Sequence, residues 1–147
     1  MQGSTIKNAS KSHIDDIVNI EKSSYENPWT KMHFQNDIKH SYAVNYVLLQ
    51  NNELIGYLFG YLIEDEYYLN KITVKSSYRN KNIGKNLFLY CLGKLRIKRV
   101  KCIQLEVSSL NLIAQKFYKS LNFIHNGIRK KYYSENEDAF LYTLRIR

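Results

Sequence analysis

Glu106 and Tyr118 stand out as side chains of types that can do acid–base chemistry. Glu106 interrupts the apolar strand pattern of Cys102–Val107, in which alternate side chains point to opposite faces. Burial in such a strand would raise the pKa of its carboxyl group and make it a general base near neutral pH, whereas a water-facing or lysine-paired glutamate would be structural. Tyr118 follows twelve positions later on a helical face with Ala114 and Leu121, a position typical of core residues.

The segment Val74–Lys85 takes the chain from the end of an expected strand into the start of an expected helix. The first N–H groups of a helix have no intrahelical acceptor and lie at the positive end of the helix dipole, so such a junction can bind a diphosphate. Arg79, Lys81 and Lys85 add positive charge, and Gly84 permits a ligand to approach the backbone. Without further context, an anion site and an ordinary basic helix start are equally good interpretations.

The elements that position these residues follow from hydrophobic patterning. Strands are expected near Ile6 and over 43–50, 54–64, 67–74, 101–107, 123–133 and 140–146. Helices are expected over 13–23, 32–38, 82–98 and 111–122, with Ser12 and Thr30 as caps and Asn51-Asn52 as a hairpin turn. This order combines hairpins with two strand–helix–strand crossovers and predicts an α/β fold, a mixed sheet with helices on both faces.

Length and composition favour one globular domain over residues 1–147. The chain has 147 residues, 44% hydrophobic and 24% charged, so a sizeable core is expected. It has neither an apolar run of membrane-spanning length nor a signal-like start, and we expect a cytoplasmic protein without membrane association. Cys91 and Cys102 match neither a metal nor a redox spacing, the histidines show no ligand-type spacing, and no metal is expected.

The junction motif Arg79-x-x-Asn82-x-Gly84 resembles the acetyl-coenzyme A turn of the GCN5-related N-acetyltransferase superfamily, Arg/Gln-x-x-Gly-x-Gly/Ala after a strand. Asn82 replaces the first glycine of that turn, and Asn122 replaces a second family glycine, the one before Phe123. Asparagine tolerates left-handed backbone angles better than other non-glycine residues, so both exchanges predict an unchanged backbone. The resemblance implies a mostly antiparallel sheet of six to seven strands.

A longer run is similar to one branch of that superfamily, the bacterial ribosomal-protein alanine N-acetyltransferases. The similar positions are Glu21, Pro28-Trp29-Thr30, Phe34, Leu105-Glu106-Val107, Asn111, Ala114, Phe117-Tyr118, Leu121, Phe123, Arg129–Tyr133 and Glu137–Ala139. This resemblance spans nearly the whole chain. It implies acetyl transfer from acetyl-coenzyme A to the α-amine of a protein N-terminus, with the N-terminal alanine of a ribosomal protein as the expected substrate.

The same resemblance implies roles for individual residues. Glu106 would act as general base, directly or through water, Tyr118 would protonate the departing thiolate, and the Val74 N–H would face the carbonyl oxygen. The expected acceptor-binding residues are Trp29, Tyr132 and Tyr133. The expected cofactor-binding residues are Ile72, Thr73, Val74, Arg79, Asn80, Lys81, Asn82, Ile83, Gly84, Lys85, Asn111 and Tyr118.

Two other functions stay open at this point. The net charge of +9, from 22 Lys and Arg against 13 Asp and Glu, predicts an anionic partner but does not choose between nucleic acid, a phosphorylated cofactor and an acidic surface. A basic ribosome- or RNA-binding module without catalysis would explain it. An acetyltransferase for a lysine side chain, a polyamine or a small molecule would share the cofactor turn. The expected enzyme itself requires no direct contact with nucleic acid.

Overall fold

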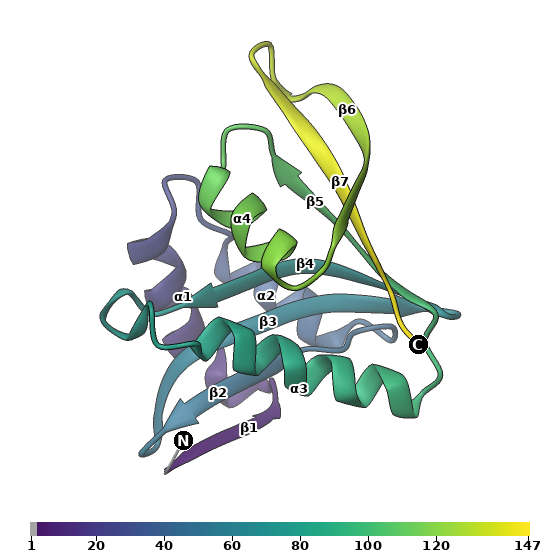
Figure 1. Cartoon of the computed structure of the whole chain (residues 1–147). Helices are drawn as coiled ribbons and strands as arrows, with labels where there is room; N and C mark the ends of the chain where they lie inside the picture. The colour runs from purple at the N-terminus through teal and green to yellow at the C-terminus, as the bar shows by residue number, and fades with distance from the viewer. Residues whose placement is uncertain (1–2) are drawn as a thin grey trace.

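The computed structural model describes residues 3–147, which form seven strands and four α-helices (Figure 1). In chain order they are β1 (Ser4–Asn8), α1 (Ile14–Ser24), α2 (Lys31–Lys39), β2 (Tyr46–Gln50), β3 (Glu53–Ile63), β4 (Glu66–Val74), α3 (Ile83–Ile97), β5 (Cys102–Ser108), α4 (Leu112–Ser120), β6 (Ile124–Ser134) and β7 (Glu137–Arg145). Short 3₁₀ turns precede α1 (η1, Lys11–His13) and α3 (η2, Ser76–Tyr78). The predicted order of elements is confirmed.

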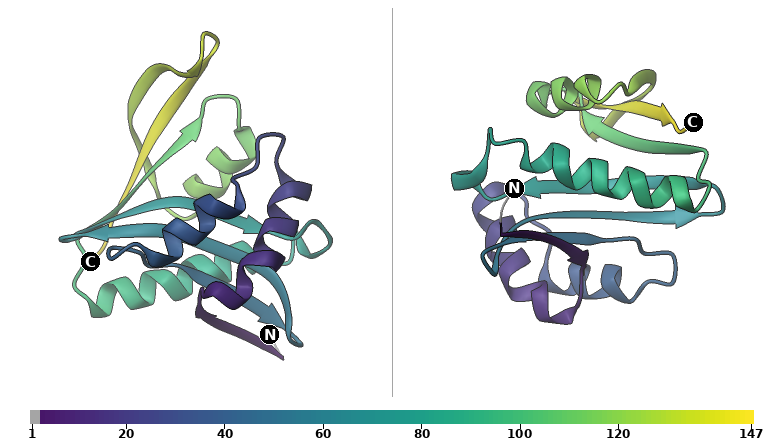
Figure 2. Two further views of the ribbon diagram at one scale, coloured as in Figure 1. Left: turned by 180° about the vertical axis from the view of Figure 1, so that it is seen from behind. Right: turned by 60° about the horizontal axis from the view of Figure 1, so that its bottom comes forward.

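One sheet contains all seven strands, in the order β1-β2-β3-β4-β5-β7-β6. Every neighbouring pair is antiparallel except β4 and β5, which are parallel. Helices α1 and α2 cover one face, and α3 and α4 cover the other (Figure 2). The expected mixed, mostly antiparallel sheet with helices on both faces is therefore confirmed. Among the described residues, no helix is both long and apolar enough to cross a membrane.

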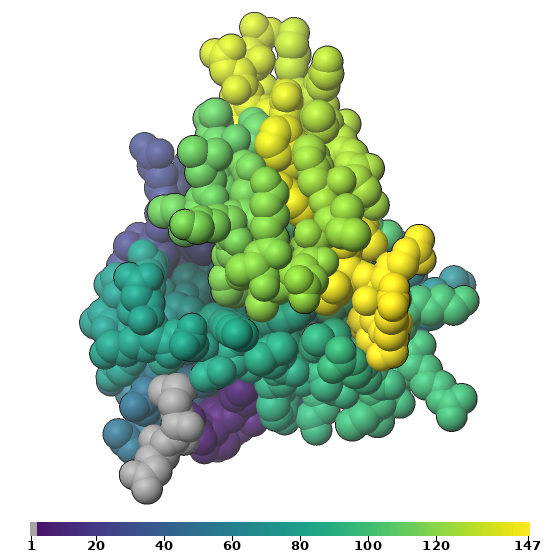
Figure 3. Space-filling model, in the orientation of Figure 1, coloured from purple at the N-terminus to yellow at the C-terminus, as the bar shows by residue number. Residues whose placement is uncertain are grey.

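Each face of the sheet has its own hydrophobic core. Under α1 and α2, the fully buried Phe34 meets Tyr57 and Phe59 edge to face, with ring centroids 5.9 and 5.2 Å apart. Under α3 and α4, a larger cluster includes Leu87 and Tyr118. Outside these layers, the far end of the β6–β7 hairpin projects beyond the rest of the chain (Figure 3).

Local backbone signals were predicted well, with one exception. Asn51 and Asn52 have φ angles of 50° and 69°, as the tight β2–β3 turn requires, and the Thr30 hydroxyl accepts a hydrogen bond from His33 N–H at 3.1 Å. Ser12 is not the cap of the first helical segment. Ser10 takes that place, and its backbone N–H donates to His13 Nδ1 at 3.0 Å.

Strands β4 and β5 pair over only three residues each, Glu66–Tyr68 against Cys102–Gln104. Immediately beyond this stretch, Phe59 of β3 pairs with Lys71 whereas Gly60 pairs with Leu69, so Asn70 is an extra residue, a β-bulge. A bulge bends its strand and increases the local twist. From there β4 follows β3 alone while β5 follows β7, and Figure 1 shows β5 leaving β4 at this point.

Gly60 is required by the packing at this bend. A methyl group placed there would lie 2.3 Å from the Tyr67 hydroxyl oxygen and 2.5 Å from the backbone oxygen of Tyr68. Tyr67 is fully buried and donates its hydroxyl hydrogen to Val44 O at 2.7 Å, so it cannot swing aside. The close approach of β4 to β3 therefore depends on the missing side chain.

We predict that Gly60→Ala lowers the free energy of unfolding by about 1–3 kcal/mol, the usual cost of overpacking a core. Gly93→Ala is the matched control, because Gly93 lies inside α3 and a methyl group there meets no atom within 4 Å. That control should gain about 0.5–1 kcal/mol from helix propensity. Urea unfolding measures both, and equal stability of Gly60→Ala and the parent chain would contradict the packing argument.

Candidate active site

The turn between β4 and α3 offers free backbone N–H groups in the predicted place. Asn80 and Asn82 both have left-handed backbones, with φ of 61° and 62°. The left-handed conformation expected at Asn82, which replaces a glycine of the family motif, is therefore confirmed. The first intrahelical bond of α3 runs from Asn86 N–H to Asn82 O, at 2.9 Å. The N–H groups of Ile83, Gly84 and Lys85 come before it and have no acceptor within the helix. Asn122 has a φ angle of 71°, so the left-handed backbone expected at this second asparagine, which also replaces a family glycine, is confirmed.

The basic side chains of this turn have different surroundings. Arg79 donates from Nε to Val74 O at 3.0 Å and from Nη2 to Ser24 Oγ at 3.2 Å, so its guanidinium joins the turn to the ends of β4 and α1. Lys81 is exposed and lies 5.5 Å from the Tyr78 ring centroid. Lys85 is exposed on the first turn of α3. These two lysines, more than Arg79, leave positive charge available to an incoming anion.

The end of β4 directs backbone donors into the space that β5 has left. Lys75 N–H donates to Ile55 O of β3 at 2.8 Å. Successive N–H groups of an extended strand point to opposite sides, so the Val74 N–H points away from β3, towards the gap. Ile72 packs towards α3, whereas Thr73 lies on the other face and its hydroxyl is 2.6 Å from the Tyr25 hydroxyl.

Tyr118 lies on α4 beside the same gap. Its side chain belongs to the larger core and contacts the rings of Phe117 and Phe123, with centroids 5.3 and 5.5 Å away, as the helical spacing predicted. Burial raises the pKa of its phenol, with a smaller effect from Tyr25, so the proton stays bound at neutral pH. Asn111 caps this helix, because its side-chain oxygen accepts from Ala114 N–H at 3.0 Å.

The other face of the sheet carries a cleft of about 860 Å³ that brings together residues far apart in sequence. Trp29 from the α1–α2 loop, Glu106 from β5 and the pair Tyr132 and Tyr133 from β6 all line it, and Lys71 of β4 lies between them. The expected acceptor-binding residues and the candidate base therefore share one cavity. This cavity lies between the separated ends of β4 and β5.

Glu106 is partly exposed and paired with a basic side chain. Its side chain is 32% exposed, and Oε1 accepts a hydrogen bond from Arg129 Nη1 at 2.7 Å. Of the two alternatives that the sequence left open, a buried carboxyl group and a water-facing or paired one, the structure shows the second, with an arginine in place of a lysine. The sheet brings the two residues together: β7 lies between β5 and β6, and Arg129 reaches across it to meet Glu106.

The tyrosine pair stands on an irregular part of β6. The register with β7 shifts first between His125 and Gly127 and again beyond Arg129, where pairing resumes only at Ser134, and Lys131 has a positive φ of 54°. Tyr132 and Tyr133 are about half-exposed on this bulge, and the Arg129 guanidinium lies 3.9 Å from the Tyr132 ring centroid. Within the bulge, the Lys131 N–H donates to Asp138 Oδ1 of β7 at 2.8 Å, so a side-chain contact takes the place of the ladder bonds in this cleft wall.

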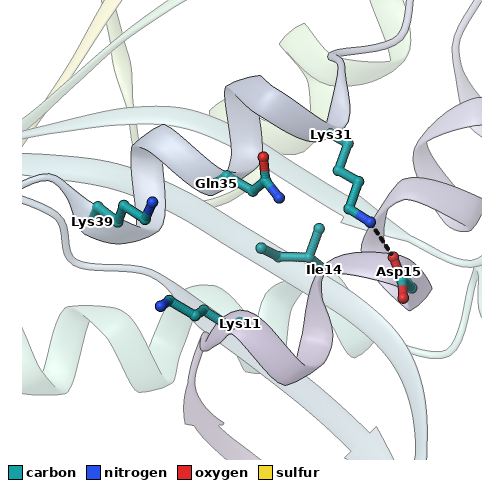
Figure 4. Close-up of a pocket in the computed structure, with 6 residues that line it drawn as sticks. All are labelled: Lys11, Ile14, Asp15, Lys31, Gln35 and Lys39. Atoms are coloured by element: carbon teal, nitrogen blue, oxygen red, sulfur yellow. Dashed lines mark ion pairs between the residues drawn. The ribbon is translucent and has the colours of Figure 1, made fainter.

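A second, smaller hollow lies between α2 and the η1–α1 segment, away from this cleft (Figure 4). Lys11, Lys31 and Lys39 surround it, and Lys31 forms an ion pair with Asp15 at 3.1 Å. It contains none of the predicted site residues. Within residues 3–147, no group of three His, Cys, Asp or Glu is arranged to hold a metal ion.

Comparison with known proteins agrees with this architecture. The family model described as acetyltransferase (GNAT) family matches residues 14–123. The chain belongs to this acetyltransferase family. A Bacillus subtilis relative, named provisionally as a [ribosomal protein bS18]-alanine N-acetyltransferase, is 32% identical over 143 residues, covering 96% of this chain and 95% of the relative.

Solved structures give the acetyltransferase close structural neighbours. The ribosomal-protein-S18-alanine N-acetyltransferase from Escherichia coli is 27% identical with a TM-score of 0.90, covering 97% of this chain and 94% of that chain. Arabidopsis thaliana Naa50, solved with the bisubstrate analogue CoA-Ac-MVNAL, is 18% identical with a TM-score of 0.83, covering 97% and 98%. The second likeness concerns the fold alone.

The acetyltransferase also contains a cleft residue that the sequence did not single out as functional. Lys71 lines the cleft and forms an ion pair with Glu21 of α1, which the sequence marked only as a position of resemblance. The one available signal was a charged residue in the middle of an expected strand. The role of this lysine depends on its ion pair with Glu21, which lies 50 positions away in the sequence.

We predict that Asn82→Gly leaves the free energy of unfolding within about 0.5 kcal/mol of the parent, whereas Asn82→Ala lowers it by about 1–2 kcal/mol. Glycine keeps the left-handed backbone at the start of α3, and alanine is strained there. Asn19→Ala is the control, because Asn19 is exposed in the right-handed helix α1 and alanine should be tolerated or slightly stabilising. Equal unfolding midpoints for the two Asn82 variants would contradict the backbone argument.

Proposed function

We propose that this acetyltransferase transfers an acetyl group from acetyl-coenzyme A to the N-terminal α-amine of a ribosomal protein, one that begins with alanine. The observation that carries the proposal is the gap between β4 and β5. On one side of it lie the anion-binding turn and the Tyr118 phenol, and on the other lies the cleft with Glu106. Two substrates could thus meet from opposite faces of the sheet.

The turn before α3 fits a diphosphate-containing cofactor. Its free N–H groups and its two left-handed asparagines form a backbone turn of the kind that binds anions. The exposed Lys81 and Lys85 add positive charge beside it. Acetyl-coenzyme A supplies an acetyl group activated as a thioester. The Val74 N–H, aimed into the gap, would donate a hydrogen bond to the carbonyl oxygen as negative charge develops there.

The cleft supplies the acceptor side. An α-amine has a pKa of about 8, so at neutral pH it carries a proton that must leave before nitrogen can attack. Glu106 would take that proton, directly or through a water molecule. Tyr118, whose pKa is raised by burial, would give its proton to the departing thiolate. No covalent bond to the protein is needed.

Two observations support a more specific substrate, the N-terminal alanine of a ribosomal protein: the names of the relatives and the residues that line the cleft. The Bacillus and Escherichia relatives carry names that assign them the alanine of a ribosomal protein, and they match nearly the full chain. Trp29, Tyr132 and Tyr133 would enclose the first residues of a peptide, and the tyrosine hydroxyls can hydrogen-bond its backbone. With such a substrate, the enzyme would act in the cytoplasm.

A peptide panel tests the proposal. One peptide starts with alanine and contains an internal lysine, a second has the same sequence with its α-amine blocked, and a polyamine represents small acceptors. Mass spectrometry after incubation with acetyl-coenzyme A should show one acetyl group on the α-amine of the first peptide alone. Acetylation of the blocked peptide or of the polyamine would assign the enzyme a different amine, and no acetylation of any acceptor would favour a binding module.

We predict that Glu106→Gln lowers turnover of the alanine peptide at pH 7 by roughly 10²–10⁴-fold, because glutamine cannot take the proton. The loss should shrink at higher pH, where the amine deprotonates unaided. Asp65→Asn is the control, since Asp65 pairs with Lys101 at the opposite end of β4. Initial rates as a function of pH measure both variants. Unchanged turnover of Glu106→Gln at pH 7 would remove Glu106 from the mechanism.

A further inference from the structure

Glu21 is the centre of a buried polar cluster behind the cleft. Its side chain is fully buried in α1, yet it accepts hydrogen bonds from the Tyr57 hydroxyl at 2.6 Å and from the Trp29 backbone N–H at 2.9 Å. The Lys71 ammonium group completes an ion pair with the same carboxylate. A buried carboxylate persists only when its oxygens are fully partnered, so these four residues hold one another in place.

Lys71 is the member of this cluster with a positively charged side chain, and it also lines the cleft. Its side chain is 10% exposed, and its ammonium nitrogen lies 4.2 Å from the Tyr25 ring centroid and 4.1 Å from that of Trp29. Burial lowers the pKa of Lys71, and Glu21 opposes that shift. The lysine therefore sits between two aromatic rings, with its charge neutralised by Glu21.

Trp29 is held from several directions by this arrangement. The His33 ring stacks on it with centroids 3.9 Å apart and an interplanar angle of 9°. The Lys71 ammonium group and the His33 ring therefore both lie against the indole. Because the Trp29 backbone is also bonded to Glu21, the indole cannot turn away unless the buried ion pair moves with it.

The two walls of the cleft consequently differ in stiffness. Trp29 and Lys71 form a wall fixed by the buried cluster. On the opposite side, Tyr132 and Tyr133 are half-exposed and belong to the bulge of β6 that does not pair with β7. The indole is the wall that is tied to a buried ion pair, so it is the one that can limit the size of an acceptor's first side chain.

We propose that Lys71 is a positioning residue that determines specificity: with Glu21, it fixes Trp29 as a rigid wall that admits only a small first side chain of the acceptor. This inference rests on the proposed α-amine acetylation and deepens it. It assigns the selection for a small residue to the buried ion pair of Glu21 and Lys71.

The double variant Glu21→Gln/Lys71→Met tests it, because removing both charges avoids leaving one buried charge without a partner. Relative to a peptide starting with alanine, kcat/KM for a matched peptide starting with leucine should rise about tenfold. KM for acetyl-coenzyme A should not change. Lys101→Met is the control, since Lys101 is exposed and pairs with Asp65 away from the cleft, and it should keep the parent selectivity. Lys71→Arg retains the charge and should largely keep it too.

A spectroscopic measurement separates positioning from general damage. Trp29 is the single tryptophan of the chain, so fluorescence excited at the red edge of the absorption band, where tyrosine does not absorb, reports on it alone. Quenching by acrylamide should increase in the double variant and stay at the parent level in Lys101→Met. Should the double variant fail to fold, His33→Ala removes the ring stacked on Trp29 without touching the Glu21–Lys71 ion pair. It should likewise increase quenching and raise the relative kcat/KM for the leucine peptide.

Unchanged selectivity in folded variants whose Trp29 is more strongly quenched would overturn the assignment of specificity to this wall. Unchanged quenching would overturn the claim that Lys71 holds the indole. If the parent chain acetylates neither peptide, the proposed function itself fails, and that result is recognisable before any variant is compared.

Discussion

The separation of β4 from β5 is the constraint on which the rest of this structure depends. Parallel strands normally continue pairing along their length, but here three residue pairs are followed by the Asn70 bulge and the strands part. A seven-stranded sheet thus acquires an opening in its middle rather than at an edge. The backbone donors at the end of β4 would be costly to leave unpaired in a dry core, so the opening suits a ligand that accepts hydrogen bonds.

Different helices and different functional groups border the opening on the two faces of the sheet. On the α3–α4 face, a helix start with free N–H groups lies near a buried phenol. On the α1–α2 face, the Glu21–Lys71 pair stabilises the cleft wall, and breaking such a buried pair by removing one partner costs on the order of 3–5 kcal/mol. Strand β6 contributes Arg129, which pairs with Glu106, and two tyrosines that line the same cleft as Glu106.

Local features of this chain were predictable because their causes are local. Left-handed Asn82 and Asn122, the Asn51-Asn52 turn and the core position of Tyr118 follow from backbone sterics or helical spacing. Features that depend on strand order were not. The sequence could not place Arg129 beside Glu106, 23 positions away, because that contact requires β7 to insert between β5 and β6. Likewise, the sequence could not predict the ion pair between Lys71 and Glu21, because these residues lie 50 positions apart.

In the function proposed here, both substrates occupy the opening together and acetyl passes directly between them. Initial rates measured over a grid of acetyl-coenzyme A and alanine-peptide concentrations test this most directly. Direct transfer predicts double-reciprocal lines that intersect, because both substrates must be bound before either product leaves. Parallel lines, the pattern of a covalent acetyl-enzyme that forms before the peptide binds, would contradict the account.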